Sequence, residues 1–176
     1  MLNLDAQAPS FSLKGVDGNP YSLNDLKGDR GIVVVFSCNH CPYVKAYEDR
    51  MIELANEYQS RGIPFALINA NDPVNYPDDD FEAMAERAQE KGYPFPYLQD
   101  ETQETATAYG AERTPEVFLF DGDLRLQYHG RIDDNYEDPS AVQQAYLKDA
   151  LEAVLSDETP PVRMTDPVGC TIKWKS

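Results

Sequence analysis

The stretch VVVFSCNHCPYVKAYEDRM, residues 33–51, decides the fold. It belongs to a run of apolar, mostly β-branched residues, 32–36, which is typical of a strand buried on both faces of a sheet. The apolar residues that follow recur every three or four positions and predict an amphipathic helix ending near Gly62. These helix residues are Val44, Tyr47, Met51, Leu54 and Tyr58.

Cys38 and Cys41 lie at the junction of this strand and this helix. Pro42 supports a helix start there, because proline lacks an N–H that the first turn would leave unpaired in any case. A helix N-terminus stabilises a thiolate, which is the reactive form of cysteine. The three-residue step places both sulfurs on one side of the helix start, so one can attack a partner's disulfide and the other can resolve the mixed disulfide.

The cysteine pair has two other possible interpretations. Two structural cysteines could lie close by chance, although the strand and helix context favours a redox pair. A zinc ion could be bound by four candidate ligands, which are Cys38, His40, Cys41 and Cys170. The chain has no second CxxC or HxxxH motif, so we expect neither a metal nor any other bound cofactor.

The remaining sequence predicts alternating strands and helices, and therefore a layered α/β domain spanning residues 1–176. Three aspartates at 78–80 suit the start of a helix, because carboxylates are favoured at its positive end. The expected elements are short strands within 9–23, a buried strand at 64–70, a helix at 81–88, a strand at 97–98, a short helix at 102–109, a hairpin of 117–120 and 124–128 turning at Asp121-Gly122, a helix at 140–155, and a proline-rich tail at 159–176.

Composition narrows the possible partners and location. The formal net charge of −16 disfavours binding to nucleic acid or to an anionic membrane surface. The N-terminal residues lack the basic and apolar regions of a signal peptide, so we expect a cytoplasmic location. Three cysteines, two of them close together, do not make a disulfide scaffold and fit a reducing compartment.

Five segments resemble the thioredoxin superfamily, within it the peroxiredoxin-like, AhpC/TSA-type group that keeps a thioredoxin CxxC. They are APSFSL (8–13), VVVFSCNHCPYVKAYE (33–48), RTPEVFLFD (113–121), YHGRIDDNY (128–136) and GCTIKW (169–174). The resemblance implies a central mixed sheet flanked by helices, with an N-terminal strand extension and a docked C-terminal tail. It also implies that Cys38 is the exposed nucleophile and Cys41 its more buried partner.

Further site residues follow from the resemblance. Thr114-Pro115 matches the cis-proline loop that pairs with an extended substrate segment. Asn39 and His40 separate the cysteines, and His40 could stabilise the Cys38 thiolate and make the disulfide more oxidising, or could simply be exposed. Glu116 could assist proton transfer from Cys41, or could be an ordinary exposed strand residue.

The tail and the 128–136 segment carry three further candidate residues, namely Cys170, His129 and Arg131. Cys170 could be a second resolving thiol, although a small packed residue in a docked tail is favoured. We expect His129 and Arg131 to be structural, with an ion pair to Asp133 or Asp134.

These observations predict a thiol–disulfide oxidoreductase in cell redox homeostasis, exchanging disulfides with protein or small-molecule thiols. Peroxiredoxins have Thr or Ser where Cys38 stands, and the loss of that hydroxyl counts against peroxide reduction. The alternative is a thiol peroxidase, an antioxidant enzyme with Cys41 as peroxidatic residue and Cys38 or Cys170 resolving. A non-catalytic binding module on the same scaffold is a third possibility. No oligomeric state is predicted.

Overall fold

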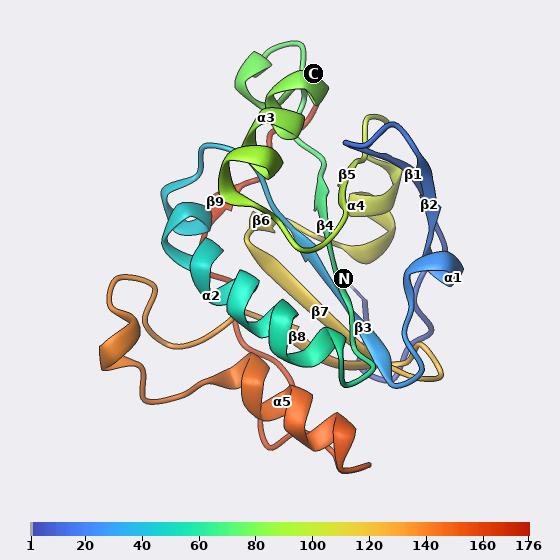
Figure 1. The fold of residues 1–176 in the computed structure, drawn as a ribbon, viewed down its shortest axis with the longest axis vertical. Helices are drawn as coiled ribbons and strands as arrows, with labels where there is room; N and C mark the ends of the chain where they lie inside the picture. The colour runs from blue at the N-terminus through green and yellow to red at the C-terminus, as the bar shows by residue number, and fades with distance from the viewer. Residues whose placement is uncertain (1) are drawn as a thin grey trace.

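The computed structural model describes residues 2–176 and is built around a mixed sheet of seven strands (Figure 1). The strand order across the sheet is β2-β1-β5-β4-β3-β7-β8. The bounds are β1 Ser12–Gly15, β2 Pro20–Ser22, β3 Gly31–Phe36, β4 Phe65–Asn69, β5 Tyr97–Gln99, β7 Glu116–Asp121 and β8 Leu126–Gly130. The expected thioredoxin-like fold with an N-terminal strand extension is confirmed, because the β1–β2 hairpin joins the sheet through β5.

Strand β3 lies inside the sheet, between β4 and β7, and every one of its residues is buried. It runs parallel to β4 and antiparallel to β7. Successive side chains of a strand point to opposite faces of a sheet. Val33 and Val35 accordingly join one hydrophobic core, while Ile32, Val34 and Phe36 join the other.

Helices cover both faces of this sheet (Figure 1). Helices α2 (Pro42–Gln59), α3 (Phe81–Lys91) and α5 (Tyr146–Leu155) contribute to the core containing Val33, and α1 (Leu23–Leu26) and α4 (Glu104–Tyr109) to the opposite core. Helix α2 begins at Pro42, as the sequence predicts, and follows β3 directly. The β3–α2 junction therefore lies at one end of the sheet between the two cores.

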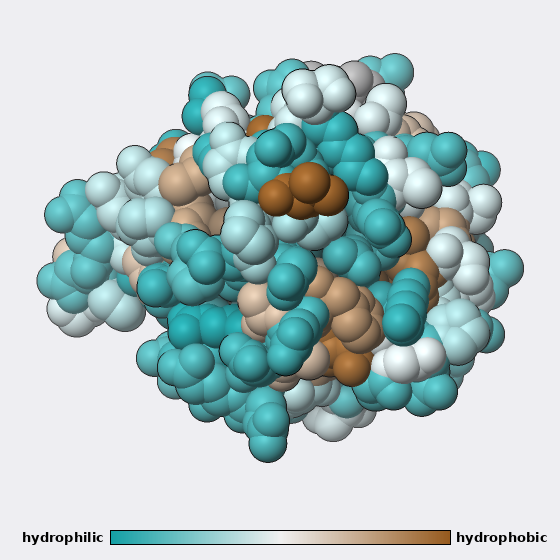
Figure 2. Space-filling view, turned by 90° about the horizontal axis from the view of Figure 1, so that it is seen from above, coloured by the Kyte–Doolittle hydropathy of each residue, from teal (hydrophilic) through white to brown (hydrophobic). Residues whose placement is uncertain are grey.

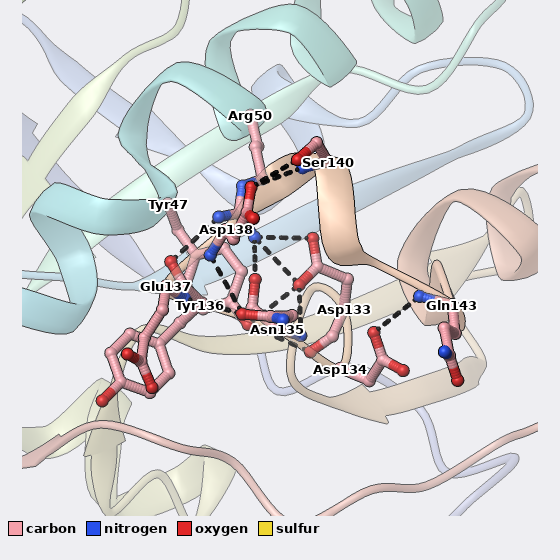
Figure 3. Close-up of polar contacts among 10 residues, drawn as sticks. All are labelled: Tyr47, Arg50, Asp133, Asp134, Asn135, Tyr136, Glu137, Asp138, Ser140 and Gln143. Atoms are coloured by element: carbon pink, nitrogen blue, oxygen red, sulfur yellow. Dashed lines mark hydrogen bonds and ion pairs between the residues drawn. The ribbon is translucent and has the colours of Figure 1, made fainter.

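The helix expected over 140–155 begins only at Tyr146. Residues 139–141 form a short 3₁₀ turn, η2, and the backbone of Gln143 is drawn back to the Asp134 carboxylate at 3.0 Å. Figure 3 shows why this loop stays on α2: Arg50 donates to both oxygens of Asp133, at 2.9 and 2.8 Å. The same guanidinium also binds carbonyls of the following residues (Figure 3), so tertiary polar contacts override the local helical pattern.

The hairpin near residue 121 also differs from the expectation. The expected strands, 117–120 and 124–128, leave a loop of three residues that includes Asp121-Gly122. Leu124 instead adopts a left-handed conformation with φ of 60°, and β8 begins at Leu126. The hairpin consequently has a longer loop and an irregular register between β7 and β8.

The C-terminal tail is docked, as expected. Its strand β9 (Cys170–Thr171) pairs antiparallel with β6 (Arg113–Thr114). Ile172 is buried, and the backbone of Lys173 accepts the amide of Asp72 at 2.8 Å and donates to Asn71 at 2.9 Å. The tail therefore closes over the same end of the sheet as the β3–α2 junction.

One end of the molecule presents a mainly polar face. Figure 2 views the end of the molecule where the C-terminus lies, and this face is mainly hydrophilic with a few separate apolar groups. Within residues 2–176, no helix combines the length and the apolar character needed to cross a bilayer.

Candidate active site

Cys38 and Cys41 both lie just before the start of α2, and both contact Thr114. Cys38 lies in the loop after β3, whereas Cys41 is the N-cap residue of α2. The Cys38 sulfur is 3.5 Å from the Thr114 hydroxyl, and the Cys41 thiol, when protonated, donates to the Thr114 carbonyl oxygen at 3.4 Å. The expectation of an exposed Cys38 is wrong: Cys38 is 3% exposed and Cys41 is 5% exposed, because both pack into the hydrophobic core formed with β3 and α2.

The thiolate is stabilised on Cys41. The pKa of Cys41 falls from 9.0 to about 4 because the Cys38 thiol donates a hydrogen bond to it, with further donation by Cys170 and by the amide of Val44. The Val44 amide is one of the unpaired N–H groups of the first helical turn, so the helix start acts on the second cysteine of the pair.

Cys38 holds its proton, contrary to the expectation that it carries the thiolate. Its pKa is raised because the proton is shared with Cys41, because the residue is buried, and because the Asp79 carboxylate lies near. Each of these effects disfavours a second negative charge in the same buried site. The pKa shifts of the reduced pair therefore favour the proton on Cys38 and the negative charge on Cys41.

A buried polar network supports the loop between the cysteines. The Asp79 carboxylate accepts the Asn39 amide at 2.8 Å and the side chains of Asn69 and Asn71, each at 3.0 Å. The Asn39 side-chain oxygen accepts the hydroxyl of Tyr97 at 2.7 Å. This network fixes the conformation of the loop, so the structure gives Asn39 a positioning role.

Asp79 is a site residue that the sequence analysis missed. The three aspartates at 78–80 suggested a helix start, but only Asp80 caps α3, by accepting the amide of Ala83 at 2.8 Å. Asp79 closes the 3₁₀ turn η1 (Pro77–Asp79) and turns inward to the cysteine loop. The only signal in the sequence was that residues 78–80 carry two more carboxylates than a helix cap needs.

The Thr114-Pro115 peptide bond is cis, as the resemblance implied. Glu116 follows it and is buried, so the interpretation as an exposed strand residue is wrong. Its carboxylate accepts the amides of Glu112 and Arg113, each at 2.9 Å, and lies 2.6 Å from the ring of His129. These contacts hold the strand that carries Thr114, and the hydrogen bonds formed by Glu116 within the described chain do not include either sulfur.

The expected partners of His129 and Arg131 are also wrong. His129 pairs with Glu116 rather than with Asp133 or Asp134, because β8 places its ring against β7. The Arg131 guanidinium lies over the ring of Tyr146, 5.6 Å from its centre. Asp133 is already bound by Arg50 from α2.

A cleft of about 270 Å³ opens beside the sulfurs. His40 is exposed and contributes to the lining of this cleft, whereas Pro115 is not among its lining residues. Cys170 reaches the cleft from the tail, directly opposite Thr114 in the β6–β9 pairing. The lining comprises Cys38, His40, Cys41, Pro42, Asn71, Asn75, Tyr76, Pro77, Asp78, Asp79, Thr114, Cys170, Thr171 and Lys173.

The arrangement offers thiol chemistry rather than a ready metal centre. Across residues 2–176, no group of three or more His, Cys, Asp or Glu side chains is placed to hold a metal ion. None of the three cysteines forms a disulfide in the structure. A thiolate, a neighbouring thiol and an adjoining cleft are the requirements for disulfide exchange.

Comparison with known proteins agrees with this geometry. Residues 4–129 match the model of the AhpC/TSA family. A crystal structure of an uncharacterized conserved protein from Geobacillus kaustophilus superposes with a TM-score of 0.94 at 45% identity, covering 99% of this chain and 94% of that one.

Two curated relatives carry functional names. The thiol-disulfide oxidoreductase ResA of Geobacillus thermodenitrificans is 30% identical over 114 residues, which are 65% of this chain and 61% of that protein. A Mycobacterium tuberculosis protein named as a peroxiredoxin is 29% identical over 112 residues, covering 64% of this chain and 66% of that protein. The match thus spans less than two thirds of the length of either relative.

Proposed function

The chain belongs to the AhpC/TSA family of the thioredoxin superfamily, and from this premise we propose that it is a thiol–disulfide oxidoreductase working through Cys38 and Cys41. The observation that carries the proposal is the placement of Cys38 and Cys41 at the start of α2, with both sulfurs against Thr114 and beside a cleft. The ResA relative supports the same reaction class. The substrates are disulfides of proteins or of small thiols.

The burial and charge of the pair give Cys41 the attacking role. Its thiolate displaces one sulfur of the substrate disulfide, which leaves as a thiolate, and a mixed disulfide forms on Cys41. Cys38 then loses its proton and attacks the Cys41 sulfur. The second substrate sulfur leaves as a thiolate and takes up that proton, so the substrate gains two electrons and the pair becomes a disulfide.

The other site residues position this pair. Thr114 contacts both sulfurs, through its hydroxyl and its carbonyl oxygen. Asn39 and Asp79 fix the loop that carries Cys38. His40 is exposed on the cleft, where it can meet a substrate and tune the potential of the pair.

A second candidate function is thiol-dependent peroxide reduction. The low pKa of Cys41 favours it, because a peroxidatic cysteine must be a thiolate. The Cys41 thiolate would break the O–O bond and become a sulfenic acid, and the Cys38 thiol would condense with it to form the disulfide and release water. The mycobacterial relative named as a peroxiredoxin supports the same chemistry.

Parallel assays of insulin reduction, with dithiothreitol as electron donor, and of hydrogen peroxide consumption separate the two functions. We expect the wild-type chain to reduce insulin faster than it consumes peroxide. The reason is that Cys38 stands where peroxiredoxins have the hydroxyl of a Thr or Ser. Cys41→Ser should abolish insulin reduction, and Cys38→Ser should slow it, because Cys38 is the thiol that resolves the mixed disulfide on Cys41. Rapid peroxide turnover without insulin reduction would reverse the ranking, and insulin reduction that survives Cys41→Ser would refute the assignment of the nucleophile.

A further inference from the structure

The C-terminal tail brings a third sulfur to the redox pair. Strand β9 pairs with β6 so that Cys170 lies opposite Thr114, the residue that contacts both Cys38 and Cys41. In an antiparallel pair, residues directly opposite each other have Cα atoms about 4.5–5.5 Å apart. Cys170 is therefore delivered to the pair by the backbone itself, and it helps to line the cleft beside the sulfurs.

Cys41 is the central sulfur of the three. The hydrogen-bonding groups that act on it include the side chains of both Cys38 and Cys170. The side chains that shift the pKa of Cys38 most strongly are Cys41, Thr114 and Asp79. The pKa of Cys170, in contrast, is raised by burial and by Cys41. Cys170 also packs against the hydrophobic core that contains Cys38 and Cys41, and all three line one cleft, so a disulfide at Cys41 can be attacked by the third thiol.

The close approach of the tail is built into its sequence. A Cβ atom added to Gly169 would lie 2.0 Å from the Thr114 carbonyl oxygen, so a larger residue could not take this place without moving the strand. On the other side of Cys170, Ile172 is buried and its amide donates to the carbonyl of Glu112 at 2.9 Å. These anchors on both sides keep the Cys170 thiol at high effective concentration beside Cys41.

We propose that Cys170 is a third redox-active residue, which exchanges with Cys38 for the disulfide bond to Cys41. The proposal rests on the proposed function in that the Cys38–Cys41 disulfide is the product of that reaction. The Cys170 thiolate attacks the Cys41 sulfur, the Cys38–Cys41 bond breaks, and Cys38 leaves as a thiolate that takes up the proton lost by Cys170. One S–S bond forms and one breaks, so no external oxidant or reductant is consumed.

This exchange changes what the protein presents to a partner. With the Cys41–Cys170 bond formed, the tail is covalently fixed along β6 and Cys38 is released as a free thiol. With the Cys38–Cys41 bond formed, the tail is held on β6 by its non-covalent contacts alone. The partition between the two disulfides therefore sets whether the edge of β6 can open to an extended partner segment.

Tryptic peptides distinguish the two disulfides directly. Cys38 and Cys41 share the peptide 31–45, while Cys170 lies in the peptide 164–173. A Cys38–Cys41 disulfide stays within one peptide, whereas a Cys41–Cys170 disulfide joins the two. The full chain is equilibrated with mixtures of glutathione and glutathione disulfide, quenched with acid and N-ethylmaleimide, digested, and read by mass spectrometry.

We expect Cys38→Ser to yield the joined peptides as its main oxidised form. The matched variant Cys41→Ser should give at least about tenfold less joined product, because the proposed exchange forms the Cys170 bond on Cys41. Glutathionylated Cys41 with free Cys170 in Cys38→Ser, or equal joining in the two variants, would overturn the proposal.

A backbone variant tests the role of docking without touching a thiol. In the Cys38→Ser background, Gly169→Ala should lower the joined fraction about tenfold, whereas Asp166→Ala, at an exposed position of the same tail, should leave it unchanged. Equal joined fractions in these two variants would overturn the docking argument, and circular dichroism melting checks that both remain folded. Joined peptides in a protein that fails to reduce insulin would overturn the proposed function and still support the exchange at Cys41.

Discussion

The buried Cys41 thiolate predicts that the stability of the reduced protein depends on pH. The folded-state pKa of Cys41, about 4, lies below its ordinary value of 9.0, so the unfolded chain binds a proton that the folded chain has lost. The stability contributed by the thiolate is therefore fully present above the unfolded pKa and is lost as pH falls through the folded pKa. Between these limits the free energy of unfolding should rise by about 1.4 kcal/mol per pH unit.

The measurement compares wild type with Cys41→Ser, both fully reduced, by urea unfolding at pH 5, 6 and 7. Most other titrating groups are common to both proteins and cancel in the difference. Cys38 stays protonated in this range, because its folded pKa is raised and its unfolded pKa lies above neutrality. From pH 5 to pH 7 the wild type should gain about 2.7 kcal/mol relative to the variant, which corresponds to a relative shift of the urea midpoint of about 1 M or more.

A constant difference between the two proteins from pH 5 to pH 7 would refute the reasoning. It would mean that Cys41 is protonated in the folded state over this range, and that the helix start and the neighbouring thiols do not hold a thiolate there. A gain that begins only near pH 7 would place the folded pKa close to neutrality and refute the strong stabilisation inferred from the hydrogen bonds of Cys41.

Three further predictions concern the residues that support the site. Asp79→Asn keeps the shape of the side chain but turns one acceptor into a donor, so it should cost about 1–3 kcal/mol of unfolding free energy by leaving a buried donor unpaired; urea unfolding with an unchanged midpoint would contradict this. Arg50→Met leaves the buried carboxylate of Asp133 without its cation and should lower the free energy of unfolding by about 3–5 kcal/mol, visible as a lower melting temperature. An unchanged melting temperature would show that the carboxylate is bound by another partner. Glu116→Gln replaces the charged acceptor of two backbone amides and of His129, so those amides should exchange with deuterium faster than in wild type; equal protection would mean that the cis-proline segment is held by other contacts.

The elements that could be predicted are those in which neighbouring residues carry the information. The run 32–36, the CxxC step and Pro42 lie in one continuous segment, and their positions directly determine a buried strand followed by a helix start. The prediction of a helix over 140–155 was wrong for its first turns. The apolar spacing there carries no information on the Asp134 carboxylate, which accepts the backbone amide of Gln143.

The candidate site divides along the same line. The sequence alone determined that two cysteines stand at a helix start behind a buried strand, and so determined the thiol chemistry and the family. Only the tertiary structure decided which sulfur bears the charge, because Thr114, Asp79 and Cys170 reach the pair from segments far along the chain. A thiol pKa depends on burial and on charges and donors within a few ångströms, and these distances are set by packing rather than by order in the sequence.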